Sequence, residues 1–473
     1  MSSKRIATDH HSRRDFIKTA GAAIGAGVVV SSLVFPPFVR AGSSDKVRLA
    51  AVGSGGKGAS DIREASKGQI VVALCDVDKD RAAKSLRLFP DAKVYTDWRK
   101  MLEKEGNNLD GITVSTPDHM HAPVTMTALS MGLATYTQKP MTRTVYEARQ
   151  LRLAADKAGV ATQMGNQHHS GIGYRMVVEM IRGGVIGKVK EAHAWSNRPI
   201  WAQGQDRPVG SDRIPVTLDW DKWLGVASPR PFKASWPAGA GYQGKRERAP
   251  YVPFGWRGWY DFGAGALGDM GCHIIDPVYW SLGLAAPNWV EYEGPTPKPE
   301  MFPSEETLTY EFPGTQYTAG NIRVKWYDGG RKPPRELAKM GNQESGTNKG
   351  KPRELPDNGS LFIGTKGALM CPHGSGPQLF PKENFSDIKR PKLKFIDHYM
   401  AWTNAIKTGG KTNCPFAYAG PLTESVLLGV IASRVPGQRL KWDTDAMQFA
   451  NSEKATQYIR DEYRTGWEVD GLS

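Results

Sequence analysis

A glycine-rich turn directly after a short apolar strand constrains the fold of this chain more than any other feature. Val47–Val52 reads as a buried strand, and Gly53-Ser54-Gly55-Gly56-Lys57-Gly58 follows at once in the pattern G-x-G-x-x-G. The first glycine permits a tight turn, the second lets the backbone approach a pyrophosphate, and the third lets the helix expected over Ala59–Ser66 pack closely. The pattern therefore predicts a dinucleotide-binding turn whose contacts come from Gly53, Gly55, Gly56 and Gly58.

An acidic residue after the second strand favours NAD as the dinucleotide. Ile70–Leu74 reads as this strand, and Asp76 follows 18 residues after Gly58. A carboxylate there can accept hydrogen bonds from both adenosine ribose hydroxyls and would repel a 2′-phosphate. The alternative is that Asp76 only caps the next helix. We expect NAD, while the charged residues that follow Asp76 keep NADP open.

Strands and helices alternate through the rest of the N-terminal third. The expected strands are Gly111–Ser115, Ala134–Thr137 and Val160–Gly165, and the expected helices are Tyr95–Lys104, Ala122–Met131 and Val145–Ala158. This alternation is typical of a doubly wound parallel sheet that binds its cofactor at the carboxyl ends of the strands. We therefore expect an α/β protein in which residues 46–166 form a Rossmann NAD-binding domain.

Polar residues follow three of these strands, where they would reach the cofactor. The expected cofactor-binding residues at these strand ends are Thr116, Pro117, His119, His121, Gln138, Lys139, Asn166 and Gln167. The histidines in these clusters, with His168 and His169, match no standard metal-ligand spacing, and no cysteine or carboxylate cluster completes a site. The sequence therefore predicts no metal.

Further along the chain, Gly263–Asp276 reads Gly-Ala-Gly-Ala-Leu-Gly-Asp-Met-Gly-Cys-His-Ile-Ile-Asp. Together with the glycine turn, Asp76, the Thr116–His121 stretch and the Lys139-Pro140 pair, it resembles the glucose–fructose oxidoreductase / inositol dehydrogenase / rhizopine catabolism (Gfo/Idh/MocA) family. The resemblance runs from about Val47 to about Asp443.

The resemblance implies a catalytic group and a second domain. The family's catalytic lysine, aspartate and histidine fall on Lys139, Asp269 and His273, whereas Gln138 stands where the family usually has glutamate. It also implies a C-terminal α+β domain with an open, mainly antiparallel sheet that covers the cofactor and often forms the dimer contact. We assign residues 167–443 to this substrate and oligomerisation domain and residues 444–473 to a C-terminal tail.

The chemistry of these residues agrees with this resemblance. Asp269 and His273 are spaced i, i+4, so a helix places them on one face, and Asp276 can join them. Oxidation of a secondary alcohol needs a base such as histidine, and a lysine can donate a hydrogen bond to the substrate oxygen. A surface salt bridge is the alternative. Glycines at 265, 268 and 271 would be costly in an exposed helix and are expected where the backbone approaches a ligand.

Tryptophans concentrate in the second half of the chain. Eight of the 14 lie between Trp195 and Trp280, separated by polar loops. Aromatic faces stack on sugar rings, although most of these tryptophans are expected in the core. Trp259 and Arg257 lie just ahead of the catalytic segment. The expected substrate-binding residues are Arg257, Trp259, Asp269, His273 and Asp276.

Later segments read as strands and closing helices of this second domain. The expected strands are Thr307–Phe312, Tyr317–Trp326, Gly359–Ile363 and Ala368–Cys371, and the expected helices are Phe395–Ile406 and Ser425–Ser433. Between them, Gly329–Asn358 is basic and poor in apolar residues, which predicts a flexible excursion from the sheet.

The N-terminus reads as an export signal. Ser12-Arg13-Arg14-Asp15-Phe16-Ile17-Lys18 is a twin-arginine signature, followed by a mildly apolar stretch and by a small-residue cleavage site that ends at Ala41. Removal of residues 1–41 takes the formal charge from +14 to +10. No other apolar run has the length of a membrane span, so no stable membrane anchor is expected. Nucleic-acid binding is not expected either, because four units of the positive charge belong to the export signal and an exported protein rarely meets nucleic acid.

We therefore expect an exported, periplasmic NAD(P)-dependent oxidoreductase that transfers hydride between nicotinamide and a secondary hydroxyl of a sugar, glycoside or cyclitol. The cofactor would be tightly bound, because free NAD is not expected outside the cytoplasm. The alternative is an NAD-dependent enzyme that cleaves a glycoside through transient oxidation of a ring hydroxyl. Expected partners are a carbohydrate or cyclitol substrate, the twin-arginine export machinery and further copies of the chain. A non-catalytic sugar-binding protein is a third possibility.

Overall fold

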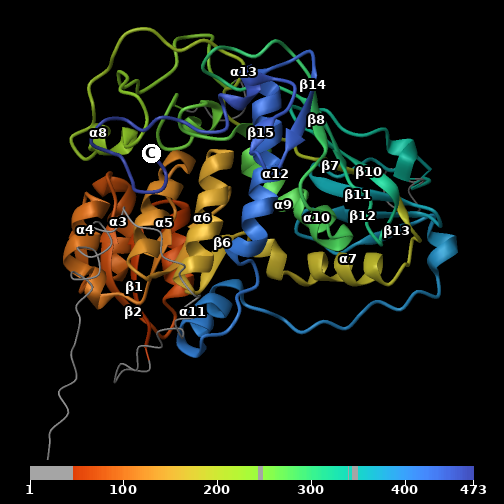
Figure 1. Cartoon of the computed structure of the whole chain (residues 1–473), viewed down its shortest axis with the longest axis horizontal. Coiled ribbons are helices and arrows are strands. Elements are labelled where there is room, and N and C mark those ends of the chain that lie inside the picture. Colours follow the sequence, from red (N-terminus) through yellow and green to blue (C-terminus); the bar gives the residue numbers. More distant parts are fainter. Residues whose placement is uncertain (1–45, 243–248, 339, 343–349) are drawn as a thin grey trace, which may run out of the picture. The chain divides into compact units, whose positions relative to one another are not determined.

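The computed structural model describes residues 46–242, 249–338, 340–342 and 350–473 (Figure 1). The expected export signal, residues 1–41, lies outside this described part.

The N-terminal half of the described chain forms a parallel sheet with strand order β3-β2-β1-β4-β5-β6 (Figure 1). Its strands are β1 (Arg48–Val52), β2 (Ile70–Cys75), β3 (Lys93–Tyr95), β4 (Gly111–Val114), β5 (Ala134–Gln138) and β6 (Thr162–Gly165). The helices that connect them are α2 (Lys57–Ala65), α3 (Lys79–Leu88), α4 (Trp98–Glu105), α5 (His121–Ser130) and α6 (Val145–Ala158). The predicted doubly wound sheet is confirmed.

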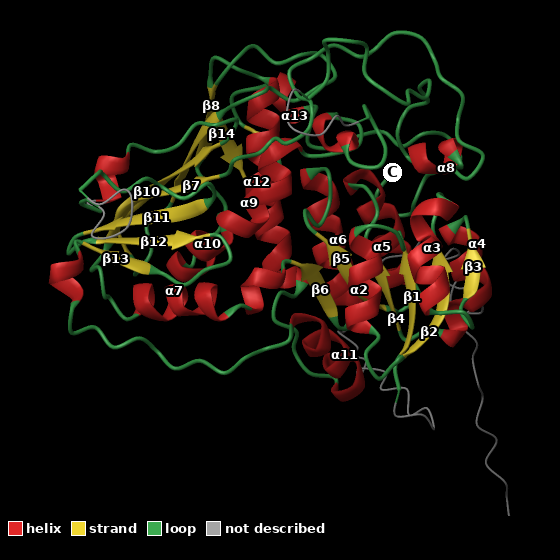
Figure 2. Cartoon of the chain, turned by 180° about the vertical axis from the view of Figure 1, so that it is seen from behind, coloured by secondary structure: helices red, strands yellow, loops and turns green. Residues whose placement is uncertain are grey.

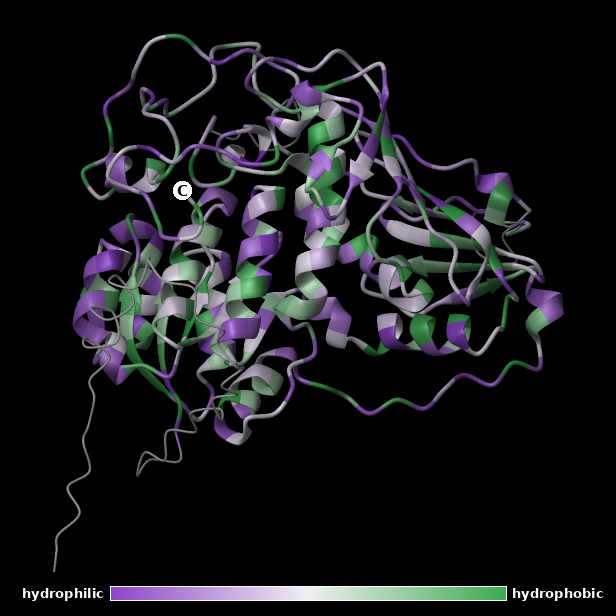
Figure 3. Cartoon of the chain, viewed as in Figure 1, coloured by the Kyte–Doolittle hydropathy of each residue, from purple (hydrophilic) through white to green (hydrophobic). Residues whose placement is uncertain are grey.

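Burial explains why these strands form the centre of the domain. Leu49, Ala51 and Ile112 are fully buried, and in Figure 3 the strands of this sheet are mainly green while α3 and α4 are largely purple. Strands covered by helices on both faces read as continuous apolar runs, which is why the sequence reveals them. Neither the short β3 nor the extent of the polar α3 was predicted, since neither carries a strong apolar pattern.

The C-terminal half contains a second, mixed sheet with order β13-β12-β11-β7-β10-β9-β8-β14-β15 among the described residues. These strands are β7 (Val189–Trp195), β8 (Trp289–Glu293), β9 (Thr307–Phe312), β10 (Thr318–Tyr327), β11 (Gly359–Gly364), β12 (Ala368–Pro372), β13 (Gln378–Phe380), β14 (Arg439–Asp443) and β15 (Gln448–Phe449). Only the β7–β10 pair is parallel, so the expected mainly antiparallel sheet is confirmed.

Helices line the second sheet and separate it from the first. Helices α7 (Ile172–Arg182) and α10 (Asp276–Leu282) lie along one face of the sheet, and α12 (Phe416–Arg434) stands between the two sheets (Figures 1 and 2). An ion pair of 2.7 Å joins Glu424 of α12 to Arg149 of α6. The remaining helices are α8 (Trp220–Leu224), α9 (Gly265–Ile274), α11 (His398–Thr408), α13 (Glu453–Thr456) and short 3-10 turns at Gly106–Asn108, Asp118–Met120, Gln167–Ser170, Gly255–Gly258, Arg335–Ala338 and Lys382–Phe385.

Helix α12 is longer than predicted and carries Pro421 in its second turn. Proline removes a backbone donor, which is why the sequence pattern supported only the later part of this helix. By length and composition α12 would be able to cross a membrane. In the described structure, however, 83% of its most apolar window is buried inside the chain, as in a core helix.

Two segments pack more tightly than their sequences suggest. In Gly329–Asn358, Ala338 is fully buried and Leu355 nearly so in a cluster with Trp195, so the described part is anchored to the sheet; residues 339 and 343–349 lie outside the description. In the C-terminal tail, the Tyr463 hydroxyl donates to Glu147 of α6 at 2.6 Å, and Leu472 is 1% exposed.

Candidate active site

The central pair of the candidate site is Lys139 with Asp269. Lys139 directly follows β5, and Asp269 lies in α9, which the chain reaches 130 residues later. The Lys139 ammonium donates to the Asp269 main-chain oxygen at 2.5 Å and to its carboxylate at 2.9 Å. Two of the three lysine N–H groups are thereby occupied, and one remains for a ligand. The structure thus joins two of the three predicted catalytic residues.

Two arginines complete the surroundings of the Asp269 carboxylate. Arg257 Nε donates to Oδ1 at 3.2 Å, and Arg198 Nε lies 3.5 Å from Oδ2. Burial alone would raise the pKa of Asp269, but the charges of Lys139 and Arg257 outweigh it and hold the pKa well below its usual value. Asp269 is therefore ionised at any working pH. Arg257 was predicted for this site, whereas Arg198 was not, because it carries no motif of its own.

The third predicted catalytic residue, His273, is oriented by Asn166. Asn166 Nδ2 donates to the carbonyl of Cys272 at 2.8 Å, so its Oδ1 is the atom that faces His273 Nδ1, at 2.6 Å. An amide oxygen only accepts, so the imidazole hydrogen is assigned to Nδ1 and the free lone pair to Nε2. Burial and the nearby Lys139 charge lower the pKa of His273 well below its ordinary value. His273 is a neutral base with a defined tautomer.

Two further imidazole rings, those of His168 and His373, lie close to His273. The ring centroid of His168 lies 5.9 Å from that of His273, and His373, from the turn after β12, lies 5.5 Å from His273 and 4.5 Å from His168. Tyr174 bonds to His373 Nδ1 at 2.8 Å. Burial lowers the pKa of His373 to about 4. His373 was not predicted, because its relation to the site exists only in the folded sheet.

The glycine turn forms a close cradle at the carboxyl end of β1. A Cβ on Gly58 would lie 1.8 Å from the Gly53 carbonyl oxygen, so α2 approaches the strand as closely as a dinucleotide turn requires. The hydroxyls of Ser54 and Thr116, on the turn and after β4, are buried and have no hydrogen-bond partner among the described residues. Such orphaned polar atoms beside a glycine cradle fit the pyrophosphate and ribose of a dinucleotide.

Main-chain N–H groups of the protein occupy most acceptor positions of the Asp76 carboxylate. Its carboxylate accepts hydrogen bonds from the main-chain N–H groups of Ser54, Gly55 and Asp78 at 2.9 to 3.0 Å. A carboxylate offers about four acceptor positions. About one position remains for a ribose hydroxyl, rather than the two that we expected.

Gln138 faces a buried carboxylate that the sequence analysis missed. Its Nε2 donates to Asp61 of α2 at 2.8 Å, and Asp61 also accepts from Ser115 Oγ at 2.8 Å and from the Tyr399 hydroxyl at 2.7 Å. Lys57, in the glycine turn, pairs with the same carboxylate. The glutamate that the family usually has at position 138 would face Asp61, which explains the uncharged glutamine.

Several predicted ligand-binding residues are engaged within the protein instead. Both ring nitrogens of His119 face the main-chain oxygens of Phe262 and Trp223, and those of His121 face Pro140 and Thr116. Both rings are buried, so they join loops rather than present donors to a cofactor. Gln167 donates to the Tyr136 hydroxyl at 2.6 Å. Neither histidine ring therefore has a nitrogen left for a cofactor.

Two predicted substrate contacts are also corrected. Trp259 is fully buried, its Nε1 donates to the Pro250 carbonyl at 2.7 Å, and its ring lies among other aromatic rings. Asp276 is fully buried as well and binds His169 at 3.0 Å and the Tyr418 hydroxyl at 2.5 Å. Since α9 ends at Ile274, Asp276 begins the next helix and leaves the face that carries His273.

The glycines around α9 serve protein packing. A Cβ on Gly263 would lie 2.7 Å from the Arg257 main chain, and one on Gly265, whose φ is +66°, would lie 2.8 Å from the Phe302 ring. At Gly271 it would crowd Leu267 and Val426. The expected approach of a ligand to these glycines is therefore replaced by the approach of neighbouring segments.

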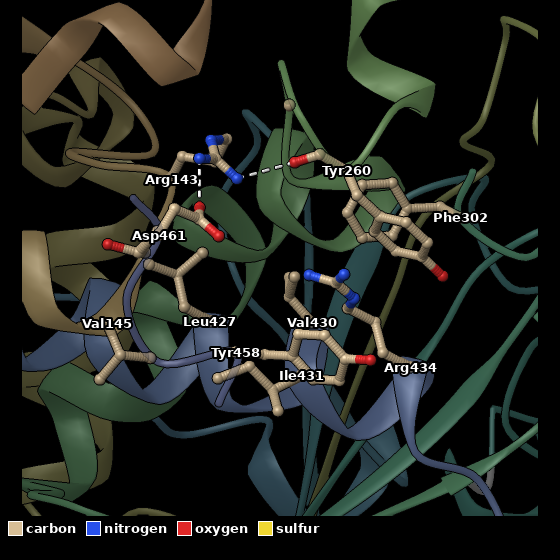
Figure 4. Close-up of a pocket in the computed structure, with 12 residues that line it drawn as sticks. Arg143, Val145, Tyr260, Phe302, Leu427, Val430, Ile431, Arg434, Tyr458 and Asp461 are labelled. Atoms are coloured by element: carbon tan, nitrogen blue, oxygen red, sulfur yellow. Dashed lines mark hydrogen bonds and ion pairs between the residues drawn. The ribbon is translucent and has the colours of Figure 1, made fainter. Parts of the chain in front are cut away.

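A small pocket is lined by residues other than those of the candidate active site. Figure 4 shows the guanidinium of Arg434 beside the rings of Tyr260 and Tyr458, whose centroids lie 4.4 and 3.7 Å from it. Arg143 binds the Tyr260 carbonyl and pairs with Asp461. None of the residues that line this pocket is a predicted catalytic residue. The pocket lies between α12 and the C-terminal tail.

Sequence comparison identifies the family to which this chain belongs. Residues 47–166 match the oxidoreductase family model described as an NAD-binding Rossmann fold, and residues 179–316 match that family's C-terminal alpha/beta domain. Together the two matches cover more than half of the chain. The chain belongs to the Gfo/Idh/MocA oxidoreductase family. Its first sheet is the NAD-binding domain, as predicted.

Individual curated proteins are similar to this chain over a shorter stretch. Among curated proteins, a glycosyl hydrolase family 109 protein of Shewanella baltica (strain OS195) is 29% identical over 209 residues, and one of Shewanella sp. (strain ANA-3) is 28% identical over the same length. These alignments cover 38% of this chain and 45% of each relative. The chain thus matches less than half of the length of these relatives.

Solved structures of two dehydrogenases share the fold. The WlbA dehydrogenase of Bordetella pertussis, in complex with NADH and UDP-GlcNAcA, superposes with a TM-score of 0.55 at 16% identity over 85% of this chain and 100% of its own. The myo-inositol dehydrogenase of Lactobacillus casei, in complex with NAD(H) and myo-inositol, has a TM-score of 0.51 at 17% identity over 84% of this chain and 97% of its own.

Proposed function

We propose that this Gfo/Idh/MocA protein transfers hydride between NAD and a secondary hydroxyl of a sugar, glycoside or cyclitol. The single observation that carries the proposal is the bond of 2.6 Å between Asn166 and His273, which leaves the His273 Nε2 lone pair free beside Lys139 and Asp269. A neutral, oriented imidazole next to an ammonium donor suits proton removal from an alcohol.

The residues present fit the cofactor. The glycine turn with Ser54 and Thr116 would hold the pyrophosphate and ribose, Asp76 would accept from a ribose hydroxyl, and Lys139 would lie near the nicotinamide. When bound, the nicotinamide supplies a hydride acceptor or donor.

The side chains of this chain supply the proton chemistry. His273 Nε2 takes the hydroxyl proton of the substrate, and Asn166 stabilises the imidazolium that results by accepting from Nδ1. Lys139 donates its remaining N–H to the substrate oxygen, and Asp269 holds the ammonium in place through two contacts. The buried setting, with Lys139 and Asp269 only 14% and 12% exposed, strengthens these interactions.

The same site also supports a redox-neutral cleavage of glycosides, and the similarity to glycosyl hydrolase family 109 proteins favours this second candidate. Oxidation of a ring hydroxyl acidifies the neighbouring C–H bond, so that a base can remove its proton as the aglycone leaves. Water then adds to the resulting unsaturated ketone, and reduction of the ketone restores the hydroxyl. The hydride removed in the oxidation would be returned in the reduction, so the cofactor would be unchanged and the net reaction would be hydrolysis.

One assay separates the two candidates. The purified protein is incubated with aryl glycosides and with free sugars and cyclitols, and both aglycone release and NADH absorbance are followed. Net oxidation predicts NADH in proportion to product, whereas redox-neutral cleavage predicts aglycone without net NADH. If denaturation releases no dinucleotide detectable by mass and added NAD does not bind, both candidates are wrong.

Export through the twin-arginine route completes the proposal. The Arg13-Arg14 pair and the apolar stretch after it support it, and a tightly bound cofactor would be loaded before transport of the folded protein. Fractionation of cells that produce the full chain tests this: the protein should reach the periplasm, and Arg13→Lys with Arg14→Lys should retain it in the cytoplasm. Homo-oligomerisation stays a prediction, which light scattering of the purified protein tests.

A further inference from the structure

Positive charge exceeds negative charge around Asp269. Lys139, Arg198 and Arg257 all lie within 3.5 Å of this carboxylate. Three cations therefore share one anion, so two positive charges remain over among the described residues. The side chains of the two arginines are only 25% and 20% exposed, and partly buried charges are poorly screened by solvent.

The two arginines also retain hydrogen-bond donors. Arg257 uses Nε for Asp269 and Nη1 for the Phe254 carbonyl, and Arg198 uses Nη1 for Asn197. For Nη2 of either arginine, no hydrogen bond to a described residue is found. The Arg198 Nε is buried and likewise lacks a hydrogen-bond acceptor there. Guanidinium groups with free N–H donors bind carboxylates and other oxyanions in a directed way.

Packing holds one of these guanidinium groups in place before any ligand arrives. The Arg257 guanidinium lies 4.2 Å from the ring centroid of Trp256 and 4.2 Å from that of Phe254. A side chain fixed in this way loses little entropy when it binds an anion. Arg257 is therefore preorganised for a ligand and does not depend on the ligand for its position.

The surplus charge is not explained by the cofactor. The glycine turn and the N-terminus of α2 bind the pyrophosphate in such a fold, whereas Arg198 follows β7 and Arg257 precedes α9, both in the C-terminal half. An oxidised nicotinamide beside Lys139 would add a further positive charge. Among the described residues, the other carboxyl that interacts with this group is Asp118, whose ionisation would still leave one positive charge in excess.

We propose that the substrate of this site is an anionic sugar, whose acidic group binds between Arg198 and Arg257 while its reacting hydroxyl faces Lys139 and His273. This inference rests on the proposed function, since it names the substrate class of that same site. A uronic acid supplies a carboxylate, and a sugar ester supplies a sulfate. Either group would replace solvent as the acceptor for the free arginine donors.

Calorimetric titration of the purified protein with its cofactor tests the proposal independently of turnover. The ligands are matched pairs: glucuronate with glucose, galacturonate with galactose, and glucose 6-sulfate with glucose. We expect at least one acid to bind about 10- to 100-fold more tightly than its neutral partner. The pair that shows the preference distinguishes a carboxylate from a sulfate.

Variants then assign the preference to the arginines. In Arg198→Gln and in Arg257→Gln, the preference for the acid should fall at least about fivefold. Arg198→Lys keeps the positive charge and should lose less of the preference for the acid. It replaces Arg198→Gln in this test if the glutamine variant does not fold. Arg207→Gln, an arginine of the same region paired with Glu300, should change nothing. Thermal melting verifies that each variant is folded.

Three results would overturn the proposal: binding of no acid in the panel, neutral sugars that bind as tightly as their acids, or a preference that survives both glutamine substitutions. Failure of the proposed function looks different. In that case the acid would still bind in preference to the neutral sugar, but neither NADH formation nor aglycone release would accompany it.

Discussion

Asn166 Oδ1 accepts a hydrogen bond from His273 Nδ1 at 2.6 Å, across 107 residues of sequence. The Cys272 carbonyl, bound by Asn166 Nδ2, fixes which way this amide faces. The bond therefore selects one tautomer of the proposed base, and an amide after β6 controls chemistry on α9.

Replacement of Asn166 by leucine should lower kcat about 10- to 100-fold with little change in KM, because the imidazole loses the partner that orients it. The acidic limb of the kcat profile should also move, since the imidazolium is no longer stabilised at Nδ1. Steady-state kinetics from pH 5 to pH 9 check this. A change confined to KM would contradict the positioning role, and Asn166→Asp, which keeps an acceptor, should retain more activity.

Restoring the family's usual glutamate at position 138 should destabilise this chain. Gln138→Glu sets two carboxylates opposite each other in a buried place, because Asp61 is fully buried and bonded to residue 138 at 2.8 Å. We expect a loss of about 1–3 kcal/mol in the free energy of unfolding. Asp61→Asn in the same chain should recover part of it, which a double-mutant cycle by chemical denaturation measures. Additive losses would contradict the direct contact.

Closing the glycine cradle should abolish cofactor binding. In Gly58→Ala the new Cβ would lie 1.8 Å from the Gly53 carbonyl oxygen, so the turn or α2 must move. Purified Gly58→Ala should carry no dinucleotide detectable by mass after denaturation. Gly376→Ala is the matched control, since its Cβ would meet only an arginine side chain at 3.7 Å. Normal cofactor content in Gly58→Ala would show that this turn is not the binding site.

Binding of an acidic sugar should weaken as the pH rises through neutrality. Burial raises the pKa of Asp118 to about 7, although Arg257 and Lys139 oppose the shift. Below this pH Asp118 is neutral and the site keeps its full excess of positive charge, whereas above it the new carboxylate offsets one charge. We expect the Kd of the acid to rise several-fold from pH 6 to pH 8.

Asp118→Asn provides the comparison for this pH effect. The variant should show a flat affinity over the same range, and the neutral sugar should show no such dependence in either protein. Isothermal titration at three pH values measures both. A Kd for the acid that falls with pH, or an equal slope in Asp118→Asn, would contradict the assignment.

Trp259 should matter for stability and not for substrate affinity. Its indole is fully buried and bonded to the Pro250 carbonyl. Trp259→Phe loses this hydrogen bond and leaves a cavity, so the free energy of unfolding should fall by about 1–3 kcal/mol while KM stays constant. Arg257→Gln, two residues earlier, should raise KM while the free energy of unfolding changes little. A large increase in KM for Trp259→Phe would show that Trp259 contacts the substrate after all.

Local sequence patterns were sufficient for the N-terminal sheet apart from β3, and they singled out Lys139, Asp269 and His273, whose catalytic role stays a prediction. The glycine turn and the strands with apolar runs depend on short-range chemistry, which a sequence displays directly. The two-sided packing of α12 was hidden because Pro421 interrupts its pattern, and its burial depends on both sheets.

The partners of polar residues were the least predictable part. Nothing near Asn166 indicates His273, and nothing near Gln138 indicates Asp61, since each pair meets only after the sheet has formed. Arg198 and His373 carry no motif and reach the site from strand ends of the second sheet. Trp259 was misassigned because its neighbour Arg257 reaches the site while its own ring turns into an aromatic core.

The last residues of the chain finish the surface of the first domain. Tyr463 bonds to α6, the Trp467 ring lies 4.0 Å from the Arg99 guanidinium of α4, and Leu472 is buried. During synthesis, the first sheet leaves the ribosome some three hundred residues before these partners exist. Its outer helices therefore keep part of their apolar surface uncovered until residues 463–472 have been synthesised. A chain shortened before Tyr463 would expose this surface of the NAD-binding domain to proteases.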